Sequence, residues 1–346
     1  MFAVNQKNMK KIILALIILS FVSCKSETNN ESIPTEKPVN EKLFLDLGGE
    51  LQYVEIIGSS NKNPILLFIH GGPAWPQTPQ LRHYNSEIAN KYTLVIWEQR
   101  GAGNSYKKNP NPKNLTLEQI VKDGHQLTTW LKEKYNQEKV YLAGYSWGSL
   151  IGINLVKDYP KDYDAYIGVA QIINMNKGIQ ITQNWLKEQA INANDKLALE
   201  KLDSLKNLSY YEDDLDRFFN QWSLLNKYNG ATFNKESEKE TEKAMSNYED
   251  YKDYDWFKVW EYSAKKMQDD MFGANIESIE EIEIPVFLLQ GRHDWNIPSK
   301  LAEEWFKKLK SPKKKLYWFE KSGHGPLEEE AKKFNRVLMG ILDELK

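Results

Sequence analysis

The chain has 346 residues and only one cysteine, Cys24, so no disulfide can form within a single copy. It also lacks a strong charge of either sign, because 46 Lys and Arg nearly balance 48 Asp and Glu. Without a basic surface, nucleic-acid binding is disfavoured. The sequence contains no phosphate-binding loop and no metal-ligand cluster, and the glycines at 101 and 103 lack the third glycine of a dinucleotide fingerprint. We therefore expect no cofactor and no metal.

Long apolar runs are scarce as well, and one of them lies near the N-terminus. Residues 12–22 are apolar and follow three lysines, and their 11 positions are too few to span a bilayer, which takes about 20. This arrangement is typical of a secretion signal, and the segment Phe21–Cys24 resembles a bacterial lipobox. We expect residues 1–24 to be a signal peptide ending at Cys24, the lipidation site, and residues 25–42 to be a polar tether.

This N-terminus predicts an exported protein, anchored to the membrane as a lipoprotein of a bacterial cell envelope. The alternative is an ordinary signal peptide with an incidental cysteine, which would give a periplasmic or secreted protein. Beyond this segment, 41% hydrophobic and 27% charged residues are ordinary for a globular protein and unlike a disordered or polytopic membrane chain. The length fits one sizeable domain that carries an insertion.

The segment Gly144–Gly148 has the pattern G-x-S-x-G and directly follows the apolar run 140–143. In a nucleophile elbow of this pattern, the serine occupies a strained turn between a strand and a helix, and the glycines let neighbouring backbone approach. Because Gly and Ser are common residues, the pattern alone would also occur by chance. Ser146 is therefore a candidate nucleophile whose context must support it.

Three other segments provide that context, and each follows its own strand-like run. His70–Ala74 follows residues 65–69, where a backbone N–H for an oxyanion hole is usually found. Asp294 follows residues 286–289, and His324 follows residues 316–319. Taken singly, such an Asp is more often a turn former and such a His a solvated loop residue. Together, in the order Ser, Asp, His, they favour a catalytic triad.

At these residues the chain resembles the α/β-hydrolase superfamily and, within it, the proline-iminopeptidase-like branch. That branch carries H-G-G-P-G, W-D-Q-R-G-x-G-x-S, G-x-S-W-G-S, G-R-x-D and a final G-H. The matching segments are His70–Ala74, Trp97–Ser105, Gly144–Ser149, Gly291–Asp294 and Gly323–His324. The resemblance spans about residues 43–172 and 283–345. Ala74 and Glu98 depart from the pattern outside the triad, so they bear on substrate preference rather than on hydrolysis.

The sequence predicts an α/β fold of the α/β-hydrolase type, with a mostly parallel sheet flanked by helices and an inserted helical cap. Thr116 should begin a helix, with Gln119 as its capping-box partner, and Pro160 should end the helix that follows Ser146. We expect residues 43–172 and 280–346 to form the catalytic domain. Residues 173–279, where the strand signal vanishes, should form the cap. Strands are expected at 43–47, 51–57, 65–69, 92–97, 140–143, 165–169, 286–289 and 316–319.

The resemblance implies a serine hydrolase that forms an acyl-enzyme. His324 should take the proton of Ser146, while Asp294 holds the imidazole. Backbone N–H groups of Trp147 and of Gly72 or Gly71 should bind the oxyanion. The other histidines fit the base position less well, and Glu98 and Arg100 are expected to support a loop.

For the substrate, the resemblance implies a small molecule or short peptide, from which an aminopeptidase releases an N-terminal proline or small apolar residue. A carboxylesterase or amide hydrolase without a free-amine requirement is the main alternative, and a non-catalytic binding lipoprotein is a remote one. An aminopeptidase must pair carboxylates with the charged amine. Candidates in the cap are interleaved with aromatic residues, although a solvated face is the competing interpretation; they are Glu249, Asp253, Asp255, Trp260 and Glu261.

Overall fold

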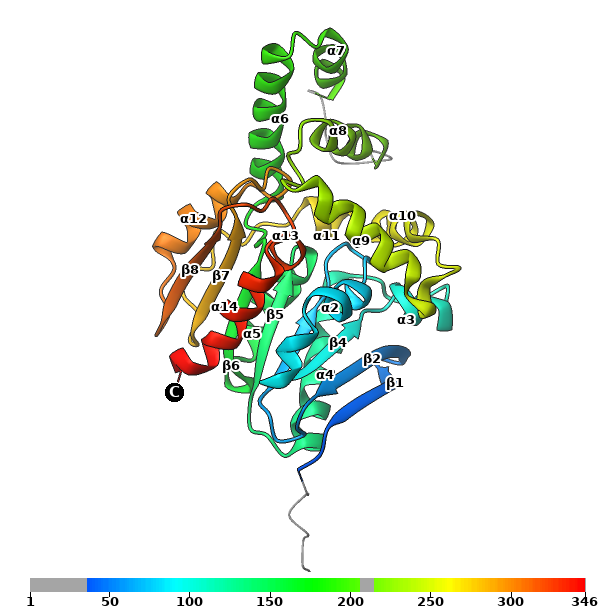
Figure 1. The fold of residues 1–346 in the computed structure, drawn as a ribbon, viewed down its shortest axis with the longest axis vertical. Helices are drawn as coiled ribbons and strands as arrows, with labels where there is room; N and C mark the ends of the chain where they lie inside the picture. The colour runs from blue at the N-terminus through cyan, green and yellow to red at the C-terminus, as the bar shows by residue number, and fades with distance from the viewer. Residues whose placement is uncertain (1–35, 206–214, 346) are drawn as a thin grey trace, which may run out of the picture. The chain divides into compact units, whose positions relative to one another are not determined.

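A computed structural model of the protein describes residues 36–205 and 215–345. Cys24, the predicted signal peptide and most of the predicted tether lie outside the described residues. Eight strands form one sheet in the order β1-β2-β4-β3-β5-β6-β7-β8, which confirms the predicted fold class (Figure 1). The strands are β1 (Val39–Leu47), β2 (Glu50–Gly58), β3 (Ile65–Ile69), β4 (Thr93–Glu98), β5 (Val140–Tyr145), β6 (Tyr163–Val169), β7 (Val286–Gly291) and β8 (Lys314–Phe319).

The sheet begins with an antiparallel hairpin and continues in parallel. β1 pairs with β2 and β2 with β4 in antiparallel register, whereas all pairs from β4 to β8 are parallel. The predicted hairpin is thus confirmed. However, β1 begins at Val39 and pairs with β2 from there, so residues 39–42 belong to the sheet and the predicted tether was too long at this end.

Helices cover both faces of the sheet. They are α2 (Thr78–Tyr84), η1 (Ser86–Asn90), α3 (Gly103–Lys108), α4 (Leu117–Tyr135), α5 (Trp147–Asp158), η2 (Pro160–Asp162), α12 (Ser299–Lys308), α13 (Pro326–Glu329) and α14 (Ala331–Leu345). Thr116 caps α4 by accepting a hydrogen bond from the Gln119 backbone N–H at 3.2 Å. The backbone N–H of Thr116 donates to the Asn114 carbonyl at 3.0 Å rather than to the Gln119 side chain, so only half of the predicted capping box forms.

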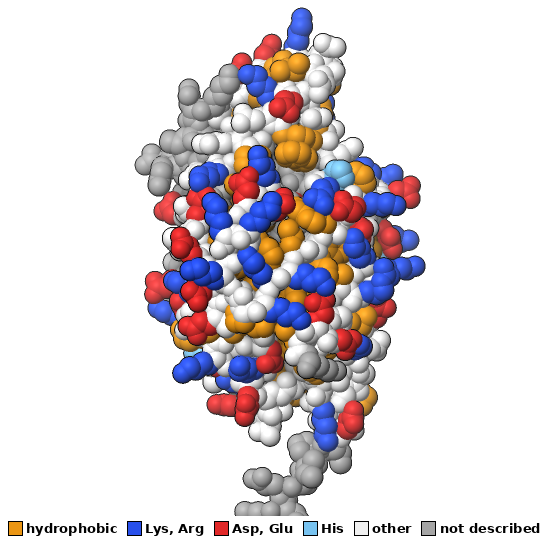
Figure 2. Space-filling view, turned by 90° about the vertical axis from the view of Figure 1, so that its left-hand side faces the viewer, with side chains coloured by type: hydrophobic (Ala, Val, Ile, Leu, Met, Phe, Trp, Pro, Cys, Tyr) orange, Lys and Arg blue, Asp and Glu red, His pale blue; other side chains and the backbone are white. Residues whose placement is uncertain are grey.

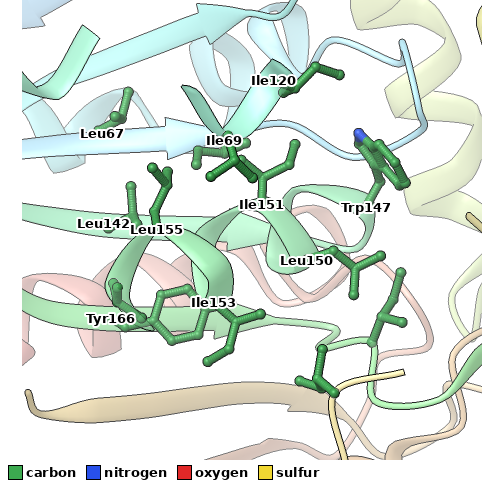
Figure 3. Packing of buried hydrophobic residues seen from close by; sticks show 14 of the residues in the cluster. Leu67, Ile69, Ile120, Leu142, Trp147, Leu150, Ile151, Ile153, Leu155 and Tyr166 are labelled. Carbon is green, nitrogen blue, oxygen red and sulfur yellow. The ribbon is translucent and has the colours of Figure 1, made fainter. Parts of the chain in front are cut away.

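Alternating strand residues build a separate hydrophobic core on each face, as a strand buried on both sides requires. Leu67 and Ile69 of β3 pack with Ile120 of α4 and Ile151 of α5, which Figure 3 shows from close by. On the opposite face, residues such as Phe68 pack with α2 and α14. The sheet is therefore held from both sides, and this rigid frame fixes the ends of its strands.

Between β6 and β7 the described residues form helices and no strand. These helices are α6 (Met175–Asn192), α7 (Lys196–Leu205), α8 (Leu215–Lys227), α9 (Lys235–Asn247), η3 (Glu249–Tyr251), α10 (Trp256–Lys266) and α11 (Gln268–Phe272). Leucines of α6, α7 and α8 share a small hydrophobic core of their own. We call α6–α11 and η3 the inserted helices.

The surface carries both charges in close mixture. On the face shown in Figure 2, Lys and Arg side chains alternate with Asp and Glu, as the near balance of charges leads one to expect. Among the described residues, none of the helices combines the length and apolar character needed to cross a membrane.

Candidate active site

Ser146 lies in the sharp turn between β5 and α5. Its backbone has φ 51° and ψ −118°, a conformation that costs on the order of 1–3 kcal/mol in a residue with a side chain. A Cβ atom added to Gly148 would clash with the carbonyl oxygens of Ile69 and His70, so this position needs glycine. The turn thus brings the nucleophile elbow against the end of β3, the close approach that the sequence pattern predicts.

Three side chains form a continuous chain of hydrogen bonds at this edge of the sheet. His324 Nε2 lies 3.0 Å from Ser146 Oγ, and His324 Nδ1 lies 2.9 Å from Asp294 Oδ2. The other oxygen of Asp294 accepts the N–H groups of Asn296 and Ile297 at 2.9 and 2.8 Å. When Nδ1–H donates to Asp294, Nε2 is left as the acceptor for the serine proton. The structure therefore brings together all three residues of the predicted triad.

The loop after β3 presents two glycines to the elbow, and their N–H groups differ. The Gly71 N–H already donates to Gln77 Oε1 at 2.7 Å. Gly72 has φ 120°, which favours glycine, and no hydrogen bond among the described residues uses its N–H. Trp147 is the first residue of α5, where backbone N–H groups have no partner inside the helix. Of the three predicted oxyanion donors, Gly72 and Trp147 suit the role, and Gly71 has a structural bond instead.

A buried network connects this loop to the elbow. Trp147 Nε1 donates to Gln99 Oε1 at 3.1 Å, and Gln99 Nε2 donates to the His70 carbonyl at 2.9 Å. His70 Nε2 accepts the Gln99 backbone N–H at 3.1 Å. Burial lowers the pKa of His70 to about 4, so this imidazole stays neutral and serves as an acceptor. The network links the side chain of Trp147 to the backbone of His70, two residues before Gly72.

Comparison with known proteins agrees with this geometry. The family described as serine aminopeptidase, S33, matches residues 88–331. The chain belongs to this family. It is 28% identical over 311 residues to a probable aminopeptidase, YbaC, of Bacillus subtilis (strain 168), covering 88% of this chain and 97% of that protein.

Two solved structures show the same fold. The proline iminopeptidase-related protein of Thermus thermophilus matches with a TM-score of 0.63 and 17% identity, covering 89% of this chain and 98% of that one. Proline iminopeptidase of Mycobacterium smegmatis matches with a TM-score of 0.61 and 14% identity, covering 88% and 98%. Together with the family match, these likenesses establish an α/β-hydrolase fold and a serine hydrolase.

In this S33 hydrolase, Glu98, which departs from the motif of the proline-iminopeptidase-like branch, has a structural role. Glu98 is fully buried and accepts hydrogen bonds from the Thr78 hydroxyl at 2.6 Å, the Asn104 N–H at 2.5 Å and the Tyr251 hydroxyl. Burial raises the pKa of Glu98 to about 7, although these hydrogen bonds act in the opposite direction. Because Tyr251 comes from η3, Glu98 ties the sheet to the inserted helices.

Arg100 also has the structural role expected for it. Its guanidinium group is buried and donates to both carboxylate oxygens of Asp123 on α4, at 2.5 and 2.8 Å. It further donates to the carbonyl groups of Lys113 and Leu47. These bonds hold the loop after β4 against α4 and the hairpin.

The segment between α8 and α9, residues 230–234, lies directly on the two loops that carry Asp294 and His324. The backbone N–H of His324 donates to the Ala231 carbonyl at 2.7 Å, and the N–H of Trp295 donates to the Gly230 carbonyl at 2.9 Å. We call residues 230–234 the contact segment. Sequence analysis missed it, because its residues belong to no motif.

Glu329 strengthens this contact from the other side. One of its oxygens accepts the N–H groups of Phe233 and Asn234, and the other accepts the N–H of Gly323, all at 2.8 Å. The only sequence signal for this residue is its position five residues after His324. Glu329 therefore joins the contact segment to the loop of the candidate base.

Four of the five predicted amine-binding residues of the inserted helices are exposed, and the fifth is buried. Glu249 and Glu261 are exposed and pair with Lys252 and Lys265, and the exposed Asp255 caps α10. Asp253 is exposed as well, whereas Trp260 is buried against Phe218 and Phe219. No hydrogen bond or ion pair among the described residues connects these carboxylates to the triad. They fit the solvated face that the sequence left open as the alternative.

The remaining histidines are occupied outside the triad. His293 stacks on Phe233 with 4.2 Å between ring centroids, His83 contacts Glu240, and His125 contacts Asp162. Within residues 36–205 and 215–345, no group of three or more His, Cys, Asp or Glu side chains is placed to hold a metal ion.

Proposed function

We propose that this hydrolase is an aminopeptidase that releases an N-terminal proline or small apolar residue from short peptides. The observation that carries the proposal is the hydrogen-bonded chain from Ser146 through His324 to Asp294, in a member of the serine aminopeptidase family. The similarity to a probable aminopeptidase over 88% of the chain supports it further.

The geometry accounts for both halves of an acyl transfer. As Ser146 Oγ attacks the substrate carbonyl, His324 Nε2 takes the hydroxyl proton, and Asp294 stabilises the imidazolium that forms. The imidazolium then gives this proton to the leaving amine, and the C–N bond breaks. Water, activated by the same imidazole, hydrolyses the acyl-enzyme and restores the serine.

Backbone N–H groups stabilise the negative charge that develops on the carbonyl oxygen. The N–H groups of Gly72 and Trp147 supply this stabilisation, each donor contributing about 3 kcal/mol in comparable sites. Because Gln99 links Trp147 to the loop that carries Gly72, little reorganisation is needed as the charge appears.

An apolar wall stands beside the oxyanion loop and suits a small apolar residue. Trp75, three residues after Gly72, contacts Trp256 and Phe257 of α10 with ring centroids 5.2 and 5.9 Å apart. Aromatic surfaces of this kind bind apolar side chains and leave charged ones poorly solvated. This wall supports the proposed preference for proline or alanine.

Kinetics with matched substrates test the proposal. We expect a prolyl or alanyl arylamide to be cleaved at least tenfold faster, in kcat/KM, than its N-acetylated counterpart, a difference of about 1.4 kcal/mol. A short-chain acyl ester serves as the third substrate. Equal rates for the free and acetylated arylamides, with the ester hydrolysed best, would instead identify a carboxylesterase.

We also propose that the protein is exported and held at the membrane by a lipid on Cys24. Support comes from the three lysines, the apolar run 12–22 and the lipobox-like segment that precedes this cysteine. Cys24→Ala should move the protein from the membrane fraction to the soluble fraction, because acyl chains would be its stable attachment. An unmodified Cys24 in the intact mass of the mature protein would contradict the proposal.

A further inference from the structure

Three consecutive glutamates, Glu328–Glu330, follow the candidate base, and they differ in their partners. Glu329 accepts three backbone N–H groups, as described above. Glu330 accepts the Lys321 N–H at 2.8 Å and the Ser322 hydroxyl at 3.0 Å. Within residues 36–205 and 215–345, no hydrogen bond or ion pair involves the Glu328 carboxylate. Glu328 is thus the one member of the run without a structural bond.

The Glu328 carboxylate lies next to the triad. A Cβ atom added to Gly325, the residue after His324, would clash with Glu328 Oε2 and lie 3.9 Å from the Tyr145 hydroxyl. Tyr145 directly precedes Ser146, and its ring centroid is 5.2 Å from that of His324. The Glu328 carboxylate and the Tyr145 hydroxyl therefore both lie close to Gly325, the residue that follows the base, and Tyr145 precedes the nucleophile.

An ionised Glu328 is unfavourable in this place. Burial, and then the charge of Glu329, raise the pKa of Glu328 to about 8. Burial, followed by the charge of Glu328, also raises the pKa of Tyr145 well above its usual range. None of the ion pairs among the described lysines and arginines compensates Glu328. A cation brought from outside the chain would do so.

The proposed function supplies such a cation, because the substrate of an aminopeptidase carries an α-ammonium group near the carbonyl that Ser146 attacks. The other carboxylates of the site are already used. Asp294 holds His324, Glu329 holds the contact segment, and Glu98 accepts three hydrogen bonds in its own buried cluster. The predicted carboxylates of α10 and η3 are exposed or serve as caps.

We propose that Glu328 is the carboxylate that pairs with the substrate's α-ammonium group, with the Tyr145 hydroxyl beside it as a second acceptor. This inference rests on the proposed aminopeptidase function and adds the residue that binds the free amine. Ammonium and carboxylate in a partly desolvated site form a charge-assisted hydrogen bond, which selects against substrates with a blocked amine.

The test compares the wild type with Glu328→Gln, which keeps the shape and removes the charge. For each protein, the ratio of kcat/KM for an alanyl arylamide to that for its N-acetylated counterpart is measured. Using this ratio cancels any general loss of catalytic power. We expect a ratio of tenfold or more in the wild type and a ratio near one in the variant. The matched control Glu240→Gln, an exposed carboxylate that pairs with His83, should keep the wild-type ratio.

Glu328→Met provides a second variant of similar size. Because burial disfavours the ionised carboxylate, neither substitution should lower Tm, and circular dichroism checks this. Alaninamide gives an independent readout, since as a competitive inhibitor it should bind the wild type at least tenfold better than either variant.

The outcomes separate the two proposals. A wild-type ratio near one would overturn the aminopeptidase function itself. A wild-type ratio above ten that persists in a folded Glu328 variant would overturn the role of Glu328 and leave the function standing.

Discussion

Polar side chains behave differently at the carboxyl ends of the strands and on the inserted helices. In the loops after β3, β5, β7 and β8, they bond to one another across long distances in the sequence, as Ser146 and His324 do across 178 positions. On η3 and α10, Glu249 and Glu261 pair with lysines three and four residues away, although Asp250 of η3 pairs with the distant Lys42.

This difference follows from geometry. Parallel strands bring their carboxyl ends to one edge of the sheet, so residues from distant segments meet there and are shielded from water. An exposed helix places i and i+4 side chains side by side in solvent, where an ion pair contributes about 0.3–0.5 kcal/mol. Substitutions should therefore have large effects at the strand ends and small ones on the inserted helices.

The largest effect is expected at the nucleophile. Ser146→Ala should lower kcat by about 10⁶-fold, because nucleophile and base act as one unit. A fluorophosphonate probe should label Ser146 in the native protein, and His324→Ala should slow this labelling by orders of magnitude. Ser204→Ala, at an exposed serine of α7, is the control. Equal labelling of His324→Ala would rule out the triad.

Asp294→Asn should come next, with a loss of about 10⁴-fold in kcat, because the amide stabilises the wrong imidazole tautomer. The remaining oxygen can still accept the N–H groups of Asn296 and Ile297, so the loop should keep its shape. Activity assays and Tm are measured together. Near-normal activity in the folded variant would show that Asp294 does not orient His324.

Glu98 should link stability to pH. Burial raises its pKa to about 7 from 4.5, so the native state binds the proton more tightly than the unfolded state. The resulting stabilisation is complete below about pH 4.5 and is lost as pH rises through about 7, with an upper value of about 3 kcal/mol. Glu328 and Glu329, whose pKa values are also raised by burial, act in the same direction.

We therefore expect Tm to fall between pH 5 and pH 8 in the wild type. Glu98→Gln should show a smaller fall, because the neutral amide does not titrate. Thermal unfolding in matched buffers measures both. An identical slope in the variant would show that other groups carry the pH dependence.

Glu329 tests whether the contact segment positions the base. Glu329→Gln keeps one acceptor oxygen and loses the charge. It should raise the activation free energy by about 2 kcal/mol, which lowers kcat about 30-fold, with little change in KM. Glu320→Gln, at the exposed pair with Arg292, is the matched control. If kcat is unchanged while Tm falls, Glu329 stabilises the fold without positioning His324.

The smallest effects are expected at Glu249 and Glu261. Because both side chains are exposed and paired with lysines, their replacement by Gln should change kcat/KM by less than about twofold and stability by less than about 0.5 kcal/mol. A tenfold loss confined to substrates with a free amine would instead return these residues to the substrate site and remove the contrast between the two regions.

Most of the sheet could be predicted from the sequence, because apolar runs bounded by turn residues identify strands. Residues 65–69 match β3 at both ends, and the other expected strands differ by a few residues at their ends. The extension of β1 to Val39 could not be predicted, since Asn40 and Lys42 are polar and their strand conformation depends on pairing with β2. Only half of the capping box forms, because the backbone N–H of Thr116, which the Gln119 side chain would accept, donates to the Asn114 carbonyl.

The candidate site was predictable to the extent that motifs mark it. Ser146, Asp294 and His324 each follow a strand, so their meeting at one edge could be expected. No motif revealed that Gln77 occupies the Gly71 N–H, or that Gln99 bridges His70 and Trp147. The acidic residues of the inserted helices were predicted to bind the amine, but the structure shows them exposed. Composition does not show which face of a helix is solvated.

The sequence by itself determined the order of the candidate catalytic residues along the chain. The serine of the elbow comes first, then the acid and then the base, and each follows a strand. Local patterns suffice for this, because strand periodicity and glycine turns act over a few residues. Only the tertiary structure decided that residues 230–234 lie on the loop of His324, and that Glu329 is bonded while Glu328 is not. Such contacts depend on how segments that are distant in the sequence pack together. The local sequence around each residue therefore does not predict them.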